Sequence, residues 1–224
     1  NHARMWYASI WIHTLKLPWS LGADLFLNNL LDGDPASNTL SWRWVAGIQT
    51  RGKSYLAKDW NIQKFTKNRF KPKETDFSAI PAEIDYIDYK MNSIKFHEAN
   101  EFDWGQSGLL VTSEDMHVLS SNRINFPLQN AYILSLTDTE KASYSENVSN
   151  FKQAISLSNK ELLSAHIQDI EMQSMDLDQI EQIISWAQQK NIKNIITLAC
   201  PCGHVRDFIN ILKNKLKKES INII

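Results

Sequence analysis

The stretch LDGDPASN at residues 31–38, followed by WRW at residues 42–44, is the most informative part of this chain. Fourteen positions hold two carboxylates, one amide and two indoles: Asp32, Asp34, Asn38, Trp42 and Trp44. Polar groups this close together, between apolar segments, indicate a ligand site rather than a surface that faces only solvent. The segments on either side are therefore expected to build a pocket around this stretch.

Helices are expected before this stretch. Met5–Leu17 carries apolar residues on all sides, which predicts a helix that is buried over most of its surface and ends near Pro18. Leu21–Leu31 has helical periodicity and predicts a second helix. The apolar stripe of this second helix is expected to hold Leu21, Leu25, Asn28 and Leu31, with Phe26 and Leu30 on its flank.

A third helix is expected to begin inside the stretch itself. Gly33 permits a sharp turn, Asp34 suits an N-cap, and Pro35 suits the first helical position. This helix is expected to run to about Gly47. Beyond it, residues 49–69 are polar and basic, and no further helix is predicted there.

From residue 107 onward the pattern changes to an alternation of strands and helices. Such an alternation predicts a small parallel sheet with right-handed crossovers. The expected strands are Leu109–Thr112, Ala131–Leu136, Ile167–Met172, Ile195–Leu198 and Ile221–Ile224. Two amphipathic helices are expected over residues 177–187 and 205–216.

The predicted fold class is thus an all-helical segment followed by a small α/β domain with a parallel sheet. We expect a partial helical domain over residues 1–75, a linker over 76–106, and a flavodoxin-like or Rossmann-like domain over 107–224. The 43% hydrophobic content of the 224 residues is enough for real cores. No apolar run approaches the roughly 20 residues that span a bilayer, so we expect a soluble, cytoplasmic protein with no membrane partner.

Charge is distributed unevenly along the chain. Residues 1–75 hold 11 Lys and Arg against 5 Asp and Glu, whereas the remainder holds 13 against 20. This asymmetry fits a front half that meets phosphate, and it fits ordinary surface scatter equally well. Nucleic-acid binding usually needs a denser basic patch than this one.

The chemistry of the front segment suggests a heteroaromatic ligand. Arg4 and Asp32 are natural ion-pair partners if the first helix packs on the second, and we expect that pair at a partly buried site. Such a pair beside a ring can tune its redox state. Asn38 supplies a donor and an acceptor on a short stem. Because Trp42 and Trp44 lie two positions apart on a helix, one can face a cofactor and the other a substrate.

In sequence, residues 1–56 resemble the C-terminal part of the FAD-binding helical domain of DNA photolyases and cryptochromes, in a bacterial cryptochrome-like branch. Ordered elements at matching separations carry the resemblance, which makes it far more specific than any one motif. These elements are Asn1-x-x-Arg4-Met5, Pro18-Trp19, Asp32-Gly33-Asp34, Ala36-Ser37-Asn38, Trp42-Arg43-Trp44 and Tyr55.

The resemblance implies a role for each matching position. Arg4 and Asp32 would be the ion pair beside the flavin of FAD, Asp34 would meet the polar edge of the isoalloxazine, and Asn38 would lie near flavin N5. Trp42 and Trp19 would be the first two steps of the tryptophan chain that photoreduces FAD. The residues implied to line the cavity for a flipped pyrimidine dimer are Asn1, Met5 and Trp44.

The implied activity is light-driven repair of DNA that contains pyrimidine dimers, a carbon–carbon lyase reaction. A blue-light photoreceptor of the cryptochrome type and an inactive remnant are the alternatives. His2 stands where photolyases commonly have an arginine, which weakens the expected lesion contact. Because the chain opens on Asn1 without an initiator methionine, we expect a truncated piece of a longer protein, itself poor in cofactor and inactive.

The α/β segment raises separate questions. The resemblance implies that it is a permuted counterpart of the family's antenna domain, of unknown pigment, or an unrelated appendage. Its Cys200-Pro201-Cys202-Gly203-His204 turn fits a redox or metal site, or a plain strand-to-helix turn; the turn is favoured because a single residue separates the thiols. His13, in the front segment, is expected to be a hydrogen-bonded residue of the fold rather than a ligand.

Overall fold

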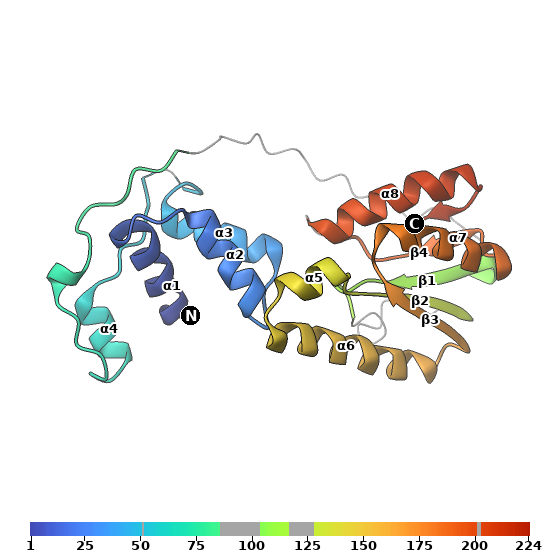
Figure 1. The fold of residues 1–224 in the computed structure, drawn as a ribbon, viewed down its shortest axis with the longest axis horizontal. Coiled ribbons are helices and arrows are strands. Elements are labelled where there is room, and N and C mark those ends of the chain that lie inside the picture. Colours follow the sequence, from blue (N-terminus) through green and yellow to red (C-terminus); the bar gives the residue numbers. More distant parts are fainter. Residues whose placement is uncertain (51, 86–103, 117–127, 201–202) are drawn as a thin grey trace. The chain divides into compact units, whose positions relative to one another are not determined.

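A computed structural model describes the chain except for residues 51, 86–103, 117–127 and 201–202. The chain divides into two compact units, Asn1–Ile94 and Lys95–Ile224 (Figure 1). The first unit is helical and the second contains a parallel sheet with helices, so the predicted fold class is confirmed. Among the described residues, no helix is both long and apolar enough to cross a membrane.

The described residues of the helical unit form four α-helices and two short irregular helices. Its core is a cluster of apolar side chains at the meeting point of the first three α-helices, with Trp42 at its centre. The elements are α1 (His2–Ser9), the π-helix η1 (Ile10–Thr14), α2 (Trp19–Asn29), α3 (Pro35–Ala46), α4 (Asp59–Phe65) and the 3-10 turn η2 (Glu74–Asp76).

The first predicted helix is present, but its end was predicted wrongly. It stops at Thr14 rather than at Leu17, and Lys16 takes the left-handed conformation with φ 58°. Leu15 is 58% exposed, so this end is not buried. The cause is local: Pro18 disfavours helical backbone at the residue before it, and the π-turn has already loosened the hydrogen-bond ladder.

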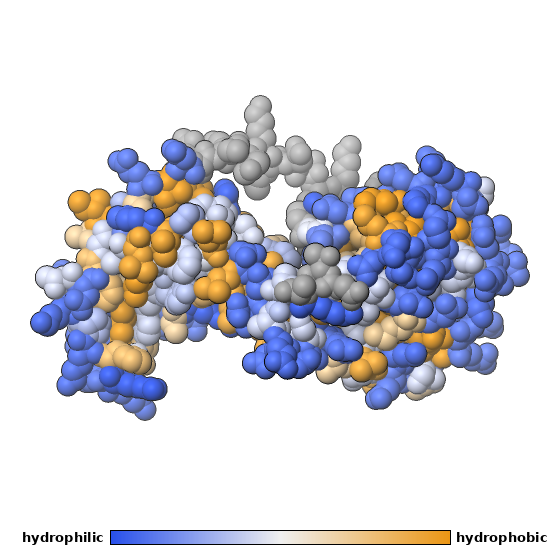
Figure 2. Space-filling view, in the orientation of Figure 1, coloured by the Kyte–Doolittle hydropathy of each residue, from blue (hydrophilic) through white to orange (hydrophobic). Residues whose placement is uncertain are grey.

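The buried face of α2 was also predicted wrongly. Leu21 and Leu31 are 59% and 51% exposed. Figure 2 shows apolar surface over this unit. The core-facing positions are instead the small residues Gly22 and Ala23. A Cβ on Gly22 would stand 2.2 Å from the ring of Trp42. The close approach of α2 and α3 therefore determines which face of α2 is buried, and the larger leucines point away from the core.

The third helix begins and ends as predicted. The Asp34 side chain accepts a hydrogen bond from the Ser37 backbone N–H at 2.7 Å, and Pro35 occupies the first helical position. The C-cap is Gly47, whose φ of 78° is strained for other residues.

The polar segment after α3 contains a helix that the sequence pattern did not reveal. Over its seven residues, α4 buries one side chain, Ile62, which packs with Trp6 and Ala57. Asn61 on α4 accepts a hydrogen bond from the Trp6 indole N–H at 2.8 Å. A helix of one or two turns with one buried apolar side chain shows too little periodicity to be recognised from the sequence.

The second unit has a five-stranded, wholly parallel sheet of order β3-β2-β1-β4-β5. This order equals the first five positions of the Rossmann arrangement. All five predicted strands are confirmed, with ends shifted by one to a few residues. The strands are β1 (Ser107–Val111), β2 (Asn130–Ser135), β3 (Asp169–Ser174), β4 (Asn194–Ile196) and β5 (Asn222–Ile223), and the turn η3 (Trp104–Gln106) precedes β1.

Helices cover both faces of this sheet. One face packs against α7 (Ile180–Gln189), with the turn η4 (Leu177–Gln179) before it, and against α8 (His204–Lys218). The opposite face packs against α6 (Glu146–Ser164), and the short α5 (Asp138–Ser143) follows β2 (Figure 1). The sequence pattern predicted α7 and α8 but neither α5 nor α6.

We predict that Gly22→Ala destabilises the helical unit by about 1–3 kcal/mol, because its new methyl group overlaps the buried ring of Trp42. Chemical denaturation followed by tryptophan fluorescence measures the change. The matched control is Asp24→Ala on the exposed side of the same helix, which should unfold like the parent chain. Equal midpoints for Gly22→Ala and the parent would contradict the close packing.

Candidate functional site

The residues of the predicted site gather in the helical unit around one cavity of about 440 Å³. Its walls come from α1, the end of α2, the turn at 30–34 and the first three turns of α3. Eight of the nine predicted site residues line it: Asn1, Arg4, Met5, Asp32, Asp34, Asn38, Trp42 and Trp44. The ninth, Trp19, lies elsewhere.

The expected ion pair forms with bidentate geometry. One Arg4 nitrogen lies 2.9 Å from Asp32 Oδ1 and the other lies 3.0 Å from Oδ2. The hydrogen bond from Arg4 lowers the pKa of Asp32, and the same bond raises the pKa of Arg4. Their side chains are 47% and 64% exposed, which corrects the expectation of a partly buried pair. The turn at 31–34 keeps the carboxylate at the rim, where solvent reaches it.

Asn38 has a fixed orientation at the inner wall. Its Nδ2 donates to the backbone carbonyl of Ala23 at 2.7 Å. Because a carbonyl can only accept, the amide nitrogen must face α2, and the acceptor Oδ1 must lie on the other side of the amide group. The side chain thus offers an acceptor, rather than a donor, to anything on that other side.

Asp34 is the N-cap of α3 and also lines the cavity. Its Oδ1 accepts from both the backbone N–H and the hydroxyl of Ser37, at 2.7 and 2.8 Å. These bonds hold the carboxylate at the N-terminus of α3, where backbone N–H groups favour a negative charge. Any contact of Asp34 with a ligand must coexist with this cap.

Trp42 is 2% exposed and forms part of the cavity wall. Its ring meets those of Phe26, Trp11 and Tyr7 edge to face, with centroids 5.0, 6.4 and 6.5 Å apart. Its indole N–H has no acceptor among the described residues, which is costly for a buried donor. The indole of Trp186 in the α/β unit shares this feature, so it does not by itself mark a site.

Sequence reasoning missed the aromatic neighbours of Trp42. Tyr7 and Trp11 lie four positions apart on the first helix, and their rings stack at 5.9 Å with planes 24° apart. That spacing is the signal that places two side chains on one helix face. The signal was hidden because apolar residues occupy every face of this helix.

The remaining tryptophans of the predicted set occupy different surroundings. Trp19 lines a second cavity, formed with Lys16 and the segment 81–85, and the Arg43 guanidinium lies 5.9 Å from the centre of its ring. Trp44 is 40% exposed at the first cavity and stacks on Tyr55 at 5.8 Å. The structure thus brings Trp44 to the cavity with an aromatic face accessible from solvent.

His2 does not reach the cavity. Its ring stacks on Phe65 of α4 with centroids 4.0 Å apart and planes 19° apart. It is absent from the described lining of the cavity. Its ring is instead part of the packing between α1 and α4.

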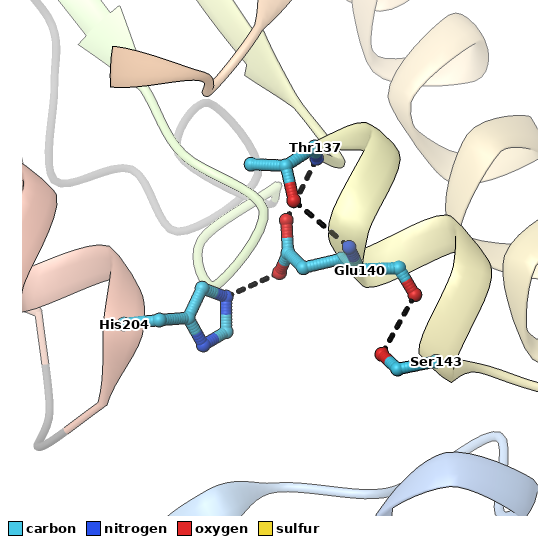
Figure 3. Close-up of polar contacts among 4 residues, drawn as sticks. All are labelled: Thr137, Glu140, Ser143 and His204. Atoms are coloured by element: carbon cyan, nitrogen blue, oxygen red, sulfur yellow. Dashed lines mark hydrogen bonds and ion pairs between the residues drawn. The ribbon is translucent and has the colours of Figure 1, made fainter.

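The α/β unit has a polar cluster of its own at the carboxyl ends of β2 and β4. His204 at the start of α8 pairs with Glu140 of α5, and Glu140 also accepts from the Thr137 backbone N–H at 2.8 Å (Figure 3). The hydrogen bond that His204 donates to the Glu140 carboxylate raises the pKa of His204. The pKa of Glu140 is lowered: burial acts against this, but its bonds to His204 and Thr137 outweigh burial. Opposite shifts make this pair strongest in mildly acidic solution, below the ordinary pKa of histidine and above that of glutamate.

The cysteine turn offers little support for redox or metal chemistry. Burial raises the pKa of the Cys200 thiol, which suppresses the reactive thiolate. Within the described residues, no group of three or more His, Cys, Asp or Glu side chains could hold a metal ion. Cys202 lies outside the described residues.

The family described as the FAD binding domain of DNA photolyase matches residues 1–76. This match covers about a third of the chain, and over that segment the chain is similar to the family. The photolyase-like segment is thereby assigned FAD as its cofactor. The resemblance found from the motifs is confirmed over this segment, and the matched segment contains the whole lining of the first cavity.

Individual relatives agree with this assignment over short stretches. A deoxyribodipyrimidine photo-lyase from Streptomyces griseus is 52% identical over 50 residues, which cover 22% of this chain and 11% of that protein. One from Buchnera aphidicola is 38% identical over 56 residues, or 25% and 12%. A cryptochrome DASH from Idiomarina loihiensis is 33% identical over 72 residues, or 32% and 15%. The chain thus matches only 11% to 15% of the length of these relatives, and no solved structure matches it.

The cavity fits the ring system of FAD better than the whole cofactor. Its volume suits one planar heterocycle. The Arg4–Asp32 pair, the Asn38 amide and the buried Trp42 supply charge, an acceptor and an aromatic wall. Among the described lining residues, Arg4 has the only cationic side chain, and Asp32 engages it, so the diphosphate lacks a partner here. These residues would therefore hold the isoalloxazine end.

We predict that Asp32→Ala leaves the stability of the helical unit nearly unchanged, because both ends of the ion pair are in solvent. Urea denaturation of the chain measures this. The comparison variant is Asp34→Ala, which removes the cap of α3 and should cost about 1 kcal/mol. An Asp32→Ala chain that unfolds more readily than Asp34→Ala would show that the pair stabilises the fold.

Proposed function

We propose that the photolyase-like segment serves light-driven, FAD-dependent repair of DNA containing pyrimidine dimers, within a longer protein. The observation that carries this proposal is the common cavity, where Arg4, Asp32, Asn38 and Trp42 converge with the accessible ring of Trp44. Bound FAD would supply light-driven transfer of one electron to the dimer, whose cyclobutane ring then splits and returns the electron.

The inner wall would orient the cofactor and set its protonation. Asn38 would present Oδ1 to the N5 edge of the ring, because its Nδ2 is committed to the carbonyl of Ala23. The Arg4–Asp32 pair would add a fixed dipole beside the ring. Asp34 would meet the polar edge of the ring from the N-terminus of α3.

The outer part of the cavity would receive the lesion. Trp44, Met5 and Asn1 line it, and Trp44 is supported from behind by the ring of Tyr55. Extruding a base pair costs a few kcal/mol and is least costly for damaged, poorly stacked bases. Stacking on aromatic side chains returns about 1–3 kcal/mol per base, so one exposed indole offsets much of that cost.

Trp42 and Trp19 would carry electrons toward the cofactor. Trp42 is at the cavity wall, and Trp19 belongs to the same apolar cluster but faces the second cavity. Trp11 and Tyr7 contact the Trp42 ring as well. Trp42 therefore has more aromatic neighbours than the proposed two-step chain includes.

A cryptochrome-type blue-light photoreceptor is the second candidate, favoured by the similarity to a protein named cryptochrome DASH. It would use the same cavity and the same Trp42 to signal instead of repairing. The α/β unit would be a counterpart of the family's antenna domain in permuted order. An inactive remnant is the third candidate, which the absence of a flavin absorption spectrum from the purified full-length protein would favour.

The test of function compares damaged and intact DNA. We predict that the full-length protein binds a duplex with one pyrimidine dimer more tightly than the same duplex without it in a gel-shift assay. Blue light should then restore the intact bases. Light-induced spectral change without preference for damaged DNA and without repair would contradict the lyase proposal and support the photoreceptor.

Electron transfer through Trp42 has its own test. We predict that Trp42→Phe in the full-length protein strongly slows photoreduction of bound FAD, whereas repair by chemically pre-reduced protein survives. The matched control is Trp60→Phe, because Trp60 is 59% exposed on α4 and does not line the cavity. Unchanged photoreduction in a folded, flavin-bearing Trp42→Phe protein would remove Trp42 from the path.

A further inference from the structure

His13 is fully buried in the helical unit, where it joins two separate segments to η1. Its Nε2 lies 3.0 Å from the carbonyl oxygen of Val45 on α3. Its Nδ1 lies 3.1 Å from the backbone nitrogen of Ala82, sixty-nine positions along the chain. One imidazole therefore connects η1, the helix that bears Trp42 and Trp44, and the segment that follows η2.

These two contacts fix the protonation state of the ring. The Ala82 N–H can only donate, so Nδ1 must be the unprotonated acceptor. The Val45 carbonyl can only accept, so Nε2 must carry the hydrogen. Both constraints select the same neutral tautomer, and a doubly protonated imidazole would place two N–H groups against each other at Ala82.

Residues 78–85 form what we call the strap. Besides the bond from Ala82, the strap is held by the Ser78 backbone N–H, which donates to Thr14 Oγ1 at 3.2 Å. Ala82 and Ile84 pack against the apolar cluster around Trp42. Residues 81–85 form one wall of the second cavity, of about 630 Å³, opposite Trp19.

We propose that His13 is a pH-sensitive latch: its neutral form holds the strap closed over the cavity at Trp19, and its protonation releases the strap. The strap has no helix or strand of its own, and two of its described hydrogen bonds go to the helices, from Ser78 and Ala82, beside the packing of Ala82 and Ile84 on the apolar cluster. Loss of the Ala82 bond removes one of these two and adds a repulsion between two N–H groups. The latch stands apart from the proposed repair activity.

Charged residues of both signs lie on the elements around the latch. Lys16 at the end of the first helix and Arg43 on α3 are the nearby cations, and Glu83 and Asp85 are the acids on the strap. Burial lowers the pKa of His13, and the charge of Lys16 lowers it further, while the bond to Val45 opposes the shift.

The sign of the pH effect follows from this shift. His13 binds a proton more readily when the strap is released than when it is closed. Higher pH therefore favours the closed state. The contribution of the latch is complete above about 6.5, the ordinary pKa of histidine, and is lost as the pH falls below it. Opening exposes the Trp19 side of the unit.

Hydrogen exchange measured by mass spectrometry on the whole chain tests the latch. After correction for intrinsic rates, we expect exchange in the peptide covering 78–85 to accelerate about tenfold per pH unit below about 6.5. A peptide from α7 in the other unit serves as the internal reference. His13→Gln, which does not titrate, should show no such acid step. Flat exchange in the parent chain, or the same acid step in His13→Gln, would overturn the proposal.

Two further variants test the latch independently, in case His13→Gln does not fold. Ala82→Pro keeps the imidazole but removes the N–H that it accepts, so the strap should exchange rapidly at every pH and show no acid step. Thr14→Val removes the acceptor for Ser78 and should loosen the strap while keeping the acid step. An acid step that survives in a folded Ala82→Pro chain would refute the latch.

The tautomer can be read directly by nitrogen NMR of the His13 ring. We expect the neutral form with hydrogen on Nε2 at pH 7.5, converting to the doubly protonated form over the range in which strap exchange accelerates. A ring with hydrogen on Nδ1 at neutral pH would exclude the bond to Ala82.

Discussion

The packing of the Trp42 ring onto Gly22 is the constraint from which the rest of the helical unit follows. It brings α2 and α3 close enough for Asn38 to reach the carbonyl of Ala23, and that bond fixes which end of the amide faces away. It also turns the leucines of α2 outward. The shape of the cavity and the orientation of its inner wall therefore both follow from the contact between Gly22 and Trp42. Protein interiors are close-packed, so the two helices cannot shift without disturbing it.

Local signals in the sequence predicted what local physics determines. The Asp34 cap, Pro35 and Gly47 set the limits of α3 because capping depends on neighbouring residues only. The strands of the second unit were recognisable because buried parallel strands are short, continuous apolar runs. The face of α2 was missed because a nearby helix, rather than periodicity, chose between glycine and leucine. The short α4 and the strap were missed because each has few apolar anchors.

The gathering of most candidate residues around one cavity was predictable from the sequence. Arg4 and Asp32, far apart in the chain, were placed together because their charges are complementary when the first helix packs on the second, and the structure brings all candidate residues but Trp19 to one cavity. Burial of the ion pair was not predictable, since exposure depends on everything that covers the rim. The neighbours of Trp42 were equally hidden, because a helix that is apolar on every side does not reveal which residues meet which partner.

The π-turn at Ile10–Thr14 has a consequence for how this segment tolerates change. A π-turn accommodates one residue more than an α-helical turn, and each residue advances a helix by about 100°. Deleting a single residue here would restore a regular α-helix and remove the wide turn from which His13 contacts Val45. The first helix can thus become regular only by losing the contacts of His13 with Val45 and Ala82. The number of residues in this turn therefore matters more than which residues they are.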